Sequence, residues 1–346
     1  MDYIQLYNQH QHILEDFWGR RNNAPTFERR ERLFGRPLHI RSNQQAILQA
    51  VDYSLPLYSN GAPIDAPPFE ITITVRPSPL SVGEPPSNLF AINHYVGFEN
   101  WLSIQIGAWG NCHIDLKGGT AQVALTPELA AHPEIVSRGL LNTIFNNLLT
   151  GSGYCMLHCT GLLQNDRLLL LMAPHNTGKS TTALRLVMSG LQLVSDSQIY
   201  VSPDHDTLHL FGFPVGKGKL RRDMVPHFPQ LQPHLTAEPV RDETKYALDL
   251  RTLNRDWVCE DAVTPQRIDL CLLTRNGREK TTLTSAELSD VWPAVVENSV
   301  FYDSAAAWNI NLQQAARVVE QSTHWHLSIG TDPDHIIETI HQLFEM

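Results

Sequence analysis

A chain of 346 residues is longer than a typical single domain, and a hydrophobic content of 42% is sufficient for a packed core. The formal net charge of −10 argues against general binding to nucleic acid or to an anionic membrane surface. Five cysteines without a C-x-x-C spacing indicate reduced thiols rather than a disulfide framework or a zinc site. No basic-then-apolar leader and no bilayer-length apolar run is present, so we expect a soluble, cytoplasmic protein.

Residues 1–130 predict an N-terminal α+β domain with a mostly antiparallel sheet. Apolar spacing predicts an amphipathic helix over residues 3–18, and the charged run 28–32 is interpreted as a solvated turn before a strand. A helix is expected near residues 44–53, and strict alternation predicts a half-buried strand over residues 69–75. Short strands broken by Asn and Gly then fill residues 89–125.

The second domain is expected to span residues 131–346. It begins with a helix over residues 133–149, whose apolar side chains recur at helical spacing and which Gly151 ends. Residues 155–163 predict one strand that leads to a turn at residues 164–166. The apolar positions of the helix over residues 133–149 do not show which of the two domains this helix packs against.

The stretch 167–201 carries the most specific pattern. A short buried strand, residues 168–172, precedes an A-x-x-x-x-G-K-S loop from Ala173 to Ser180, which is a variant of the Walker A motif. A helix over residues 179–189 follows, and a second buried strand, 191–194, leads into Asp196. A strand, a loop, a helix and a second strand that is followed by an acidic residue, in this order, are typical of a site that binds nucleotide phosphates. A G-K-S sequence alone can occur by chance.

The loop predicts binding of ATP and Mg²⁺. Successive backbone N–H groups and the first turn of the helix would hold phosphate oxygens, Lys179 would reach the β- and γ-phosphates, and the Ser180 hydroxyl would bind Mg²⁺. Asp196 can face the same point and is a second candidate metal ligand. The motif usually begins with glycine, so Ala173 is tolerated only if its φ is negative. The residues expected to bind the nucleotide are Asn176, Thr177, Gly178, Lys179, Ser180 and Thr181.

The compact spacing resembles that of the HPr kinase/phosphorylase family. His158 follows a short strand, the loop comes next, Gly190 ends the helix and Asp196 ends the following strand, as in the family pattern. The similarity covers residues 153–201 well, extends more loosely to the C-terminus and includes little before residue 130. It implies a compact P-loop kinase domain of the HPr kinase type, with ATP and Mg²⁺ as cofactors and a serine hydroxyl as acceptor.

The resemblance also implies residue roles. Asp196 would be the catalytic base, His158 would lie beside the phosphates, and Lys179 completes the candidate catalytic set. Two alternatives stay open, because Asp196 can instead be a metal ligand and His158 can be an ordinary core histidine. The family's second acid is replaced by Ser197, which puts reverse phosphorolysis in doubt.

Residues 217–222 contain four basic side chains, which either clamp a phosphate or an acidic acceptor or form a solvated face. No acidic residue lies between Asp206 and Asp223, so the family's additional metal ligand has no counterpart there.

His324 and His326 form an H-x-H pair that lacks an evident third metal ligand. The remaining expected elements are a loop over 226–239, strands over 245–250, 268–274 and 324–329, a helix over 285–292 that Pro293 ends or kinks, and helices over 311–321 and from 333 onward.

The sequence therefore predicts an ATP-dependent kinase that transfers the γ-phosphate to a hydroxyl of a pathway-specific peptide, protein or small molecule. The N-terminal region does not resemble that of the enzymes that phosphorylate HPr, so the acceptor is expected to differ from HPr. A non-catalytic, nucleotide-binding regulatory or scaffold protein is the alternative, favoured by Ala173 and Ser197. The resemblance also allows a homo-oligomer.

Overall fold

The structure is a computed structural model that describes residues 25–77, 82–204, 207–236, 244–299 and 305–346. The helix expected over residues 3–18 lies outside these residues. The chain forms two compact units, with Leu57–Ala62 and Gly153–Met346 in the second and the remainder in the first. The sequence analysis placed the junction at residue 130, but the helical run 133–151 belongs to the first unit. The spacing of apolar residues in this run predicts a buried helix face, but it does not identify the sheet that this face covers.

The first unit is built on a seven-stranded sheet in the order β1-β2-β3-β7-β6-β5-β4. The β2–β3 and β3–β7 pairs are parallel and the other four pairs are antiparallel, so the sheet is mostly antiparallel. Its strands are β1 (Phe27–Leu33), β2 (Arg36–Ser42), β3 (Phe69–Val75), β4 (Asn93–Phe98), β5 (Trp101–Ile106), β6 (Gly110–Asp115) and β7 (Thr120–Leu125).

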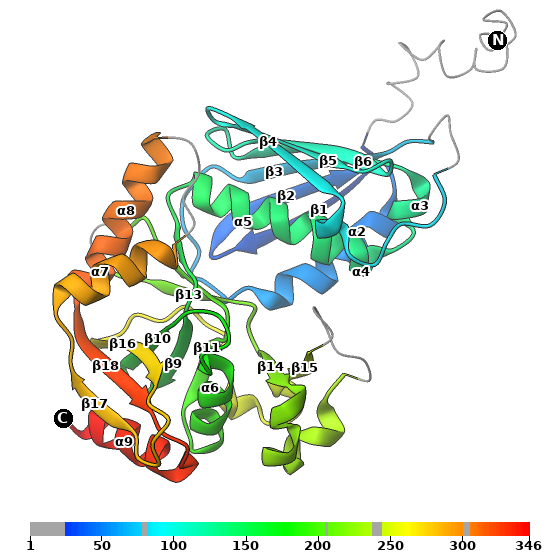
Figure 1. Ribbon diagram of the computed structural model, residues 1–346. Coiled ribbons are helices and arrows are strands. Elements are labelled where there is room, and N and C mark those ends of the chain that lie inside the picture. Colours follow the sequence, from blue (N-terminus) through cyan, green and yellow to red (C-terminus); the bar gives the residue numbers. More distant parts are fainter. Residues whose placement is uncertain (1–24, 78–81, 205–206, 237–243, 300–304) are drawn as a thin grey trace, which may run out of the picture. The chain divides into compact units, whose positions relative to one another are not determined.

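The charged run 28–32 was expected to be a turn but lies within the edge strand β1 and pairs with β2. Charged side chains are common on edge strands, where they discourage pairing with other chains. Helices cover one face of the sheet (Figure 1), and their buried side chains include Ile47, Ile144 and Leu148. These elements are α2 (Gln45–Ser54), α3 (Pro127–Ala130), α4 (Pro133–Val136), a π-helical turn (Ser137–Leu141) and α5 (Asn142–Gly151).

The second unit contains a six-stranded sheet in the order β11-β9-β10-β16-β18-β17. Its three central strands β10, β16 and β18 are parallel, and the outer pairs are antiparallel. The strands are β9 (Thr160–Gln164), β10 (Arg167–Met172), β11 (Gln192–Ser195), β16 (Arg267–Arg275), β17 (Thr282–Ser285) and β18 (Ser322–Ile329). Smaller sheets are formed by β8 (Cys155–Leu157), β12 (Gln198–Val201) and β13 (Leu210–Phe213), and by β14 (Lys217–Arg221) and β15 (Lys245–Asp249).

Residues 155–163 were predicted as one strand but form two, β8 and β9, which belong to different sheets. His158 lies at the break between them. An apolar run does not show where a chain changes sheets, because the apolar pattern continues through the change. His158 therefore belongs to neither strand.

Strand β10 is buried on both faces. Leu169 and Leu171 pack with α6 (Lys179–Met188) and α9 (Pro333–Glu345), whereas Leu168 and Leu170 pack with α7 (Leu288–Glu297) and α8 (Ala305–Glu320). Alternate residues of a strand point to opposite faces, so a continuous apolar run is required here. The helices on both faces, visible in Figure 1, hold the end of β10 in place, and the Walker A-type loop begins there.

Two further expectations are corrected. Pro293 lies inside α7, so the alternative that it ends the helix is wrong, whereas the alternative of a kink stays a prediction. Val291 and Val295, on either side of it, are buried and stabilise the helix by packing. Residues 226–239 were expected to be a loop, but their described part contains the end of one 3₁₀ helix, Arg222–His227, and a second, Pro229–His234. Within the described residues, no helix has the length and apolar composition needed to cross a membrane.

Candidate functional site

The loop between β10 and α6 is shaped by two residues with positive φ. Asn176 has φ of 63° and Gly178 has φ of 122°, a conformation that L side chains rarely adopt. Ala173 is buried and is not among the described non-glycine residues with positive φ, so its methyl group is tolerated where the motif usually has glycine. The substitution of glycine by Ala173 therefore requires no positive φ at this position.

Three hydrogen bonds fix the loop. Thr177 Oγ1 donates to the Pro174 carbonyl at 2.9 Å, Arg275 Nε donates to the Thr177 carbonyl at 2.6 Å, and Lys179 Nζ donates to the Ala173 carbonyl. Gly178 is the N-cap of α6 and supplies no side-chain cap. The N–H groups of the first helical turn therefore face the loop without intrahelical partners, as is typical of anion sites.

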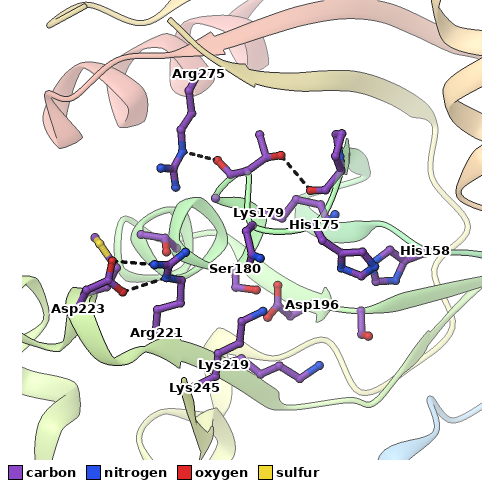
Figure 2. Close-up of a pocket in the computed structure, with 17 residues that line it drawn as sticks. His158, His175, Lys179, Ser180, Asp196, Lys219, Arg221, Asp223, Lys245 and Arg275 are labelled. Atoms are coloured by element: carbon purple, nitrogen blue, oxygen red, sulfur yellow. Dashed lines mark hydrogen bonds and ion pairs between the residues drawn. The ribbon is translucent and has the colours of Figure 1, made fainter. Parts of the chain in front are cut away.

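A pocket of about 250 Å³ opens beside the loop (Figure 2). Five basic and two acidic side chains line it, so the pocket is cationic in a protein whose net charge is −10. The lining residues are His158, Pro174, His175, Asn176, Thr177, Gly178, Lys179, Ser180, Thr181, Asp196, Ser197, Lys219, Arg221, Asp223, Met224, Lys245 and Arg275. Such a concentration of positive charge favours a polyanionic ligand.

Asp196 directly follows β11 and is 7% exposed. Its Oδ1 accepts a hydrogen bond of 3.2 Å from Thr160 Oγ1, while its buried Oδ2 has no hydrogen-bond partner among the described residues. Burial raises the pKa of Asp196 to about 6, and the Ser180 hydroxyl, Lys219, Thr160 and Lys179 oppose this rise. At neutral pH the carboxylate is mostly ionised and is a stronger proton acceptor than an exposed aspartate.

His158 faces the same pocket. Its backbone N–H donates to the Asn298 carbonyl at 2.6 Å, and its ring centroid lies 5.3 Å from that of His175. Burial, followed by the charge of Lys179, lowers the pKa of His158 to about 4. The imidazole is therefore neutral at physiological pH and can form hydrogen bonds without carrying charge.

Lys179 is 9% exposed and lines the pocket from the first turn of α6. Burial lowers its pKa, and the nearby Cys159 and Asp196 partly oppose this effect. An ammonium group in such a confined place is more loosely hydrated than one in bulk water, so it interacts strongly with an anionic ligand.

The residues expected to act in catalysis, nucleotide binding and metal binding lie around this one pocket: His158, the loop residues 176–181 and Asp196. In the basic segment, Lys219 and Arg221 line the pocket, and Arg221 is held by Asp223 at 2.9 and 3.0 Å. Lys217 instead pairs with Asp249 at 2.9 Å.

Lys245 and Arg275 also line the pocket but were not selected from the sequence. Arg275 ends β16, the parallel neighbour of β10, and the carboxyl ends of such strands meet at one edge, so this signal was available. Lys245 reaches the pocket because β15 places it opposite Arg221, and no local sequence pattern indicates that pairing.

Both histidines of the H-x-H pair have protein partners among the described residues. The His324 ring is hydrogen-bonded to the Val319 carbonyl at 2.9 Å, and the His326 ring lies 3.0 Å from Asp290. Across the described ranges, no group of three or more His, Cys, Asp or Glu residues is placed to hold a metal ion.

No protein-family model and no curated protein matches this chain. Among solved structures, it is distantly similar to the Hpr(Ser) kinase/phosphatase from Coxiella burnetii, with 12% sequence identity and a TM-score of 0.27 over 55% of this chain and 97% of that chain. Similarity at this level carries no argument about function. The chemistry of the site is therefore argued from its own residues.

Proposed function

We propose that this protein is an ATP-dependent kinase that transfers the γ-phosphate to a hydroxyl group of an acceptor. The observation that carries the proposal is the Asp196 carboxylate, which is buried in the same pocket as the Walker A-type loop and keeps one oxygen without a partner. Burying such a group is costly unless it serves a purpose, and a protein that only binds nucleotide does not require it.

The phosphates of ATP would be bound by residues Asn176–Thr181. The N–H groups at the start of α6 and the Lys179 ammonium face the pocket and provide donors and positive charge. Lys219 and Lys245 add charge from the β14–β15 ribbon, opposite the loop (Figure 2). Charge neutralisation and positioning provide most of the catalysis in phosphoryl transfer, so this arrangement suits the reaction.

The donor atoms in the pocket fit Mg²⁺. Asp196 Oδ2 has no hydrogen-bond partner among the described residues, and Ser180 lines the same pocket. Mg²⁺ prefers oxygen ligands and usually takes only one or two from the protein when it binds together with substrate phosphates. When bound, the ion would neutralise and orient phosphate oxygens.

Asp196 would activate the acceptor hydroxyl. Its pKa near 6 lets it accept a proton while it is mostly ionised at neutral pH. The neutral His158 ring would orient the acceptor or the γ-phosphate through a hydrogen bond. The acceptor hydroxyl, expected to be that of a serine, would belong to a pathway-specific peptide, protein or small molecule.

Transfer of label from γ-labelled ATP, with Mg²⁺, into a fractionated lysate of the source cells tests this proposal. We expect wild type to label one fraction, and Lys179→Ala and Asp196→Asn to label none. Lys280→Ala, a change at an exposed position that does not line the pocket, is the matched control and should behave as wild type. Tight ATP binding by wild type without transfer, and without hydrolysis above the two variants, would instead indicate a nucleotide-dependent regulatory or scaffold protein.

A further inference from the structure

The segment Leu57–Ala62 belongs to the second unit, although the residues on both sides of it belong to the first. Its backbone is bound into the second unit by several hydrogen bonds. The Leu57 carbonyl accepts from Val215 N at 2.8 Å, Asn60 N donates to the Glu260 carbonyl at 2.7 Å, and the Asn60 carbonyl accepts from Ala262 N at 2.7 Å. This segment is therefore a structural part of the unit that carries the pocket.

Ser59, at the middle of this segment, is 2% exposed and is bound to Gly212 of β13. Gly212 N donates to Ser59 Oγ at 2.8 Å, and Ser59 N donates to the Gly212 carbonyl at 3.2 Å. The Tyr58 ring packs on the Phe213 ring with centroids 4.3 Å apart. Ser59 therefore satisfies both backbone polar groups of Gly212, which would otherwise be costly to bury.

Strand β13 lies directly against the end of β11. A Cβ atom at Gly212 would be 2.2 Å from the Val194 carbonyl oxygen, so only glycine allows the two backbones to approach so closely. One residue further along each strand, Ser195 Oγ donates a hydrogen bond of 2.7 Å to the Phe213 carbonyl. The position of β13 thus determines where the Ser195 hydroxyl points.

The Ser195 hydroxyl in turn closes the bend that carries Asp196. It accepts hydrogen bonds from Ser197 N at 3.1 Å and from Gln198 N at 3.3 Å. With one donor and two acceptor positions in use, the hydroxyl has no spare hydrogen-bonding capacity. A shift of the Phe213 carbonyl would rotate this hydroxyl and loosen the backbone on both sides of Asp196.

We infer that Ser59 is a positioning residue for Asp196 and acts through Gly212, Phe213 and Ser195. The inference rests on the proposed function, because these contacts would orient the Asp196 carboxylate for the proposed reaction. A displacement well below 1 Å at a catalytic group is sufficient to slow a reaction severely. The residue therefore affects the rate without touching the substrate.

The first readout is amide hydrogen exchange, which does not depend on activity. In Ser59→Ala, the amides of Ser197 and Gln198 should exchange about fivefold faster, as expected when one hydrogen bond of this network is lost. Ser59→Thr retains the hydroxyl and should restore slow exchange. Ser202→Ala is the matched control, since Ser202 is also buried in the second unit and its hydroxyl has no hydrogen-bond partner among the described residues.

The second readout is catalytic. Ser59→Ala should lower kcat about tenfold and leave the KM for MgATP within twofold of wild type, because Ser59 is not one of the residues that line the pocket. Ser195→Ala removes the same link from its other end, which provides a second variant if Ser59→Ala does not fold. In the double variant the two losses in kcat should not add, because both changes break one chain of contacts.

Unchanged exchange at Ser197 and Gln198 in Ser59→Ala would overturn the inference, as would faster exchange with an unchanged kcat. An inactive wild type would overturn the proposed function instead. In that case amide exchange decides the question without activity: faster exchange at Ser197 and Gln198 in Ser59→Ala, with slow exchange restored in Ser59→Thr, would support the positioning role, and unchanged exchange would reject it.

Discussion

Thr160 Oγ1 donates a hydrogen bond of 3.2 Å to Asp196 Oδ1 and thereby joins the start of β9 to the bend after β11. Thr160 is fully buried, so this bond is shielded from water. It occupies one oxygen of the carboxylate, whereas Oδ2 is buried and has no hydrogen-bond partner in the part of the chain that the structure describes. The hydrogen bond therefore helps to orient Asp196 and is one of several interactions that oppose the rise in its pKa caused by burial.

Replacing Thr160 with valine should shift the pH dependence of turnover. The hydrogen bond favours the ionised carboxylate, so its loss raises the pKa of Asp196 above its value of about 6, by roughly one unit. Activity requires the ionised form and rises with pH through this pKa. We expect the midpoint of the kcat profile to move upward by the same amount, with a large loss at pH 6 and a small one at pH 8.

His158→Gln is the control for that profile. The pKa of His158 is about 4, so His158 does not titrate near pH 6, and this variant should retain a midpoint near 6 whatever its maximal rate. A midpoint that disappears in His158→Gln and stays in place in Thr160→Val would assign the titration to the histidine.

Asp196→Asn should stabilise the protein at neutral and alkaline pH. Because the folded-state pKa of Asp196 is raised from 3.8 to about 6, ionisation costs more in the folded state, and the cost develops as the pH rises from below 3.8 to above 6. Above pH 6 it amounts to roughly 2–3 kcal/mol, at about 1.4 kcal/mol per pKa unit. Thermal unfolding should show a melting temperature several degrees higher for the variant at pH 8, and a much smaller difference at pH 4.5. Equal differences at both pH values would contradict this account.

Lys179→Ala should weaken MgATP binding by roughly 10- to 100-fold, because a charge-assisted hydrogen bond to phosphate contributes about 1.5–3 kcal/mol. Titration calorimetry at two salt concentrations measures this loss. The affinity of wild type should also fall more steeply with salt than that of the variant, since one cation of the pocket has been removed. Lys280→Ala should match wild type in both respects, and an equal loss there would mean that general surface charge, rather than the pocket, attracts the nucleotide.

Arg167→Met should destabilise the second unit by about 3 kcal/mol. Arg167 Nε lies 2.5 Å from Asp269 Oδ2, and the Asp269 carboxylate is fully buried in the central strand β16. Removing the arginine leaves a buried charge that is held chiefly by Trp325, whose Nε1 donates to Asp269 Oδ1 at 2.9 Å.

Arg267→Met provides the comparison. Arg267 is 3.5 Å from the same carboxylate, and its side chain is 37% exposed, so its removal should cost less than about 1 kcal/mol. Urea denaturation of both variants measures the two costs. Similar values for the two arginines would show that the ion pair with Arg167 is not the dominant contact of Asp269.

The sequence by itself determined the centre of the candidate site. The buried strand, the loop from Ala173 to Ser180, the helix after it and the position of Asp196 are local features, set by apolar periodicity, glycine conformations and helix starts within about 30 residues. The mostly antiparallel sheet of the first unit and the strand over Phe69–Val75 were predicted on the same basis.

Only the tertiary structure decided what surrounds that centre. Arg275 and Lys245 reach the pocket through pairing with β10 and β14, and Leu57–Ala62 joins the second unit from within the sequence of the first. The sequence places these residues about 50 to 140 positions from Asp196, and no local propensity records such pairing. Long-range pairings form because the whole chain buries apolar surface and satisfies its backbone groups at once, so they are properties of the assembled fold rather than of any single segment.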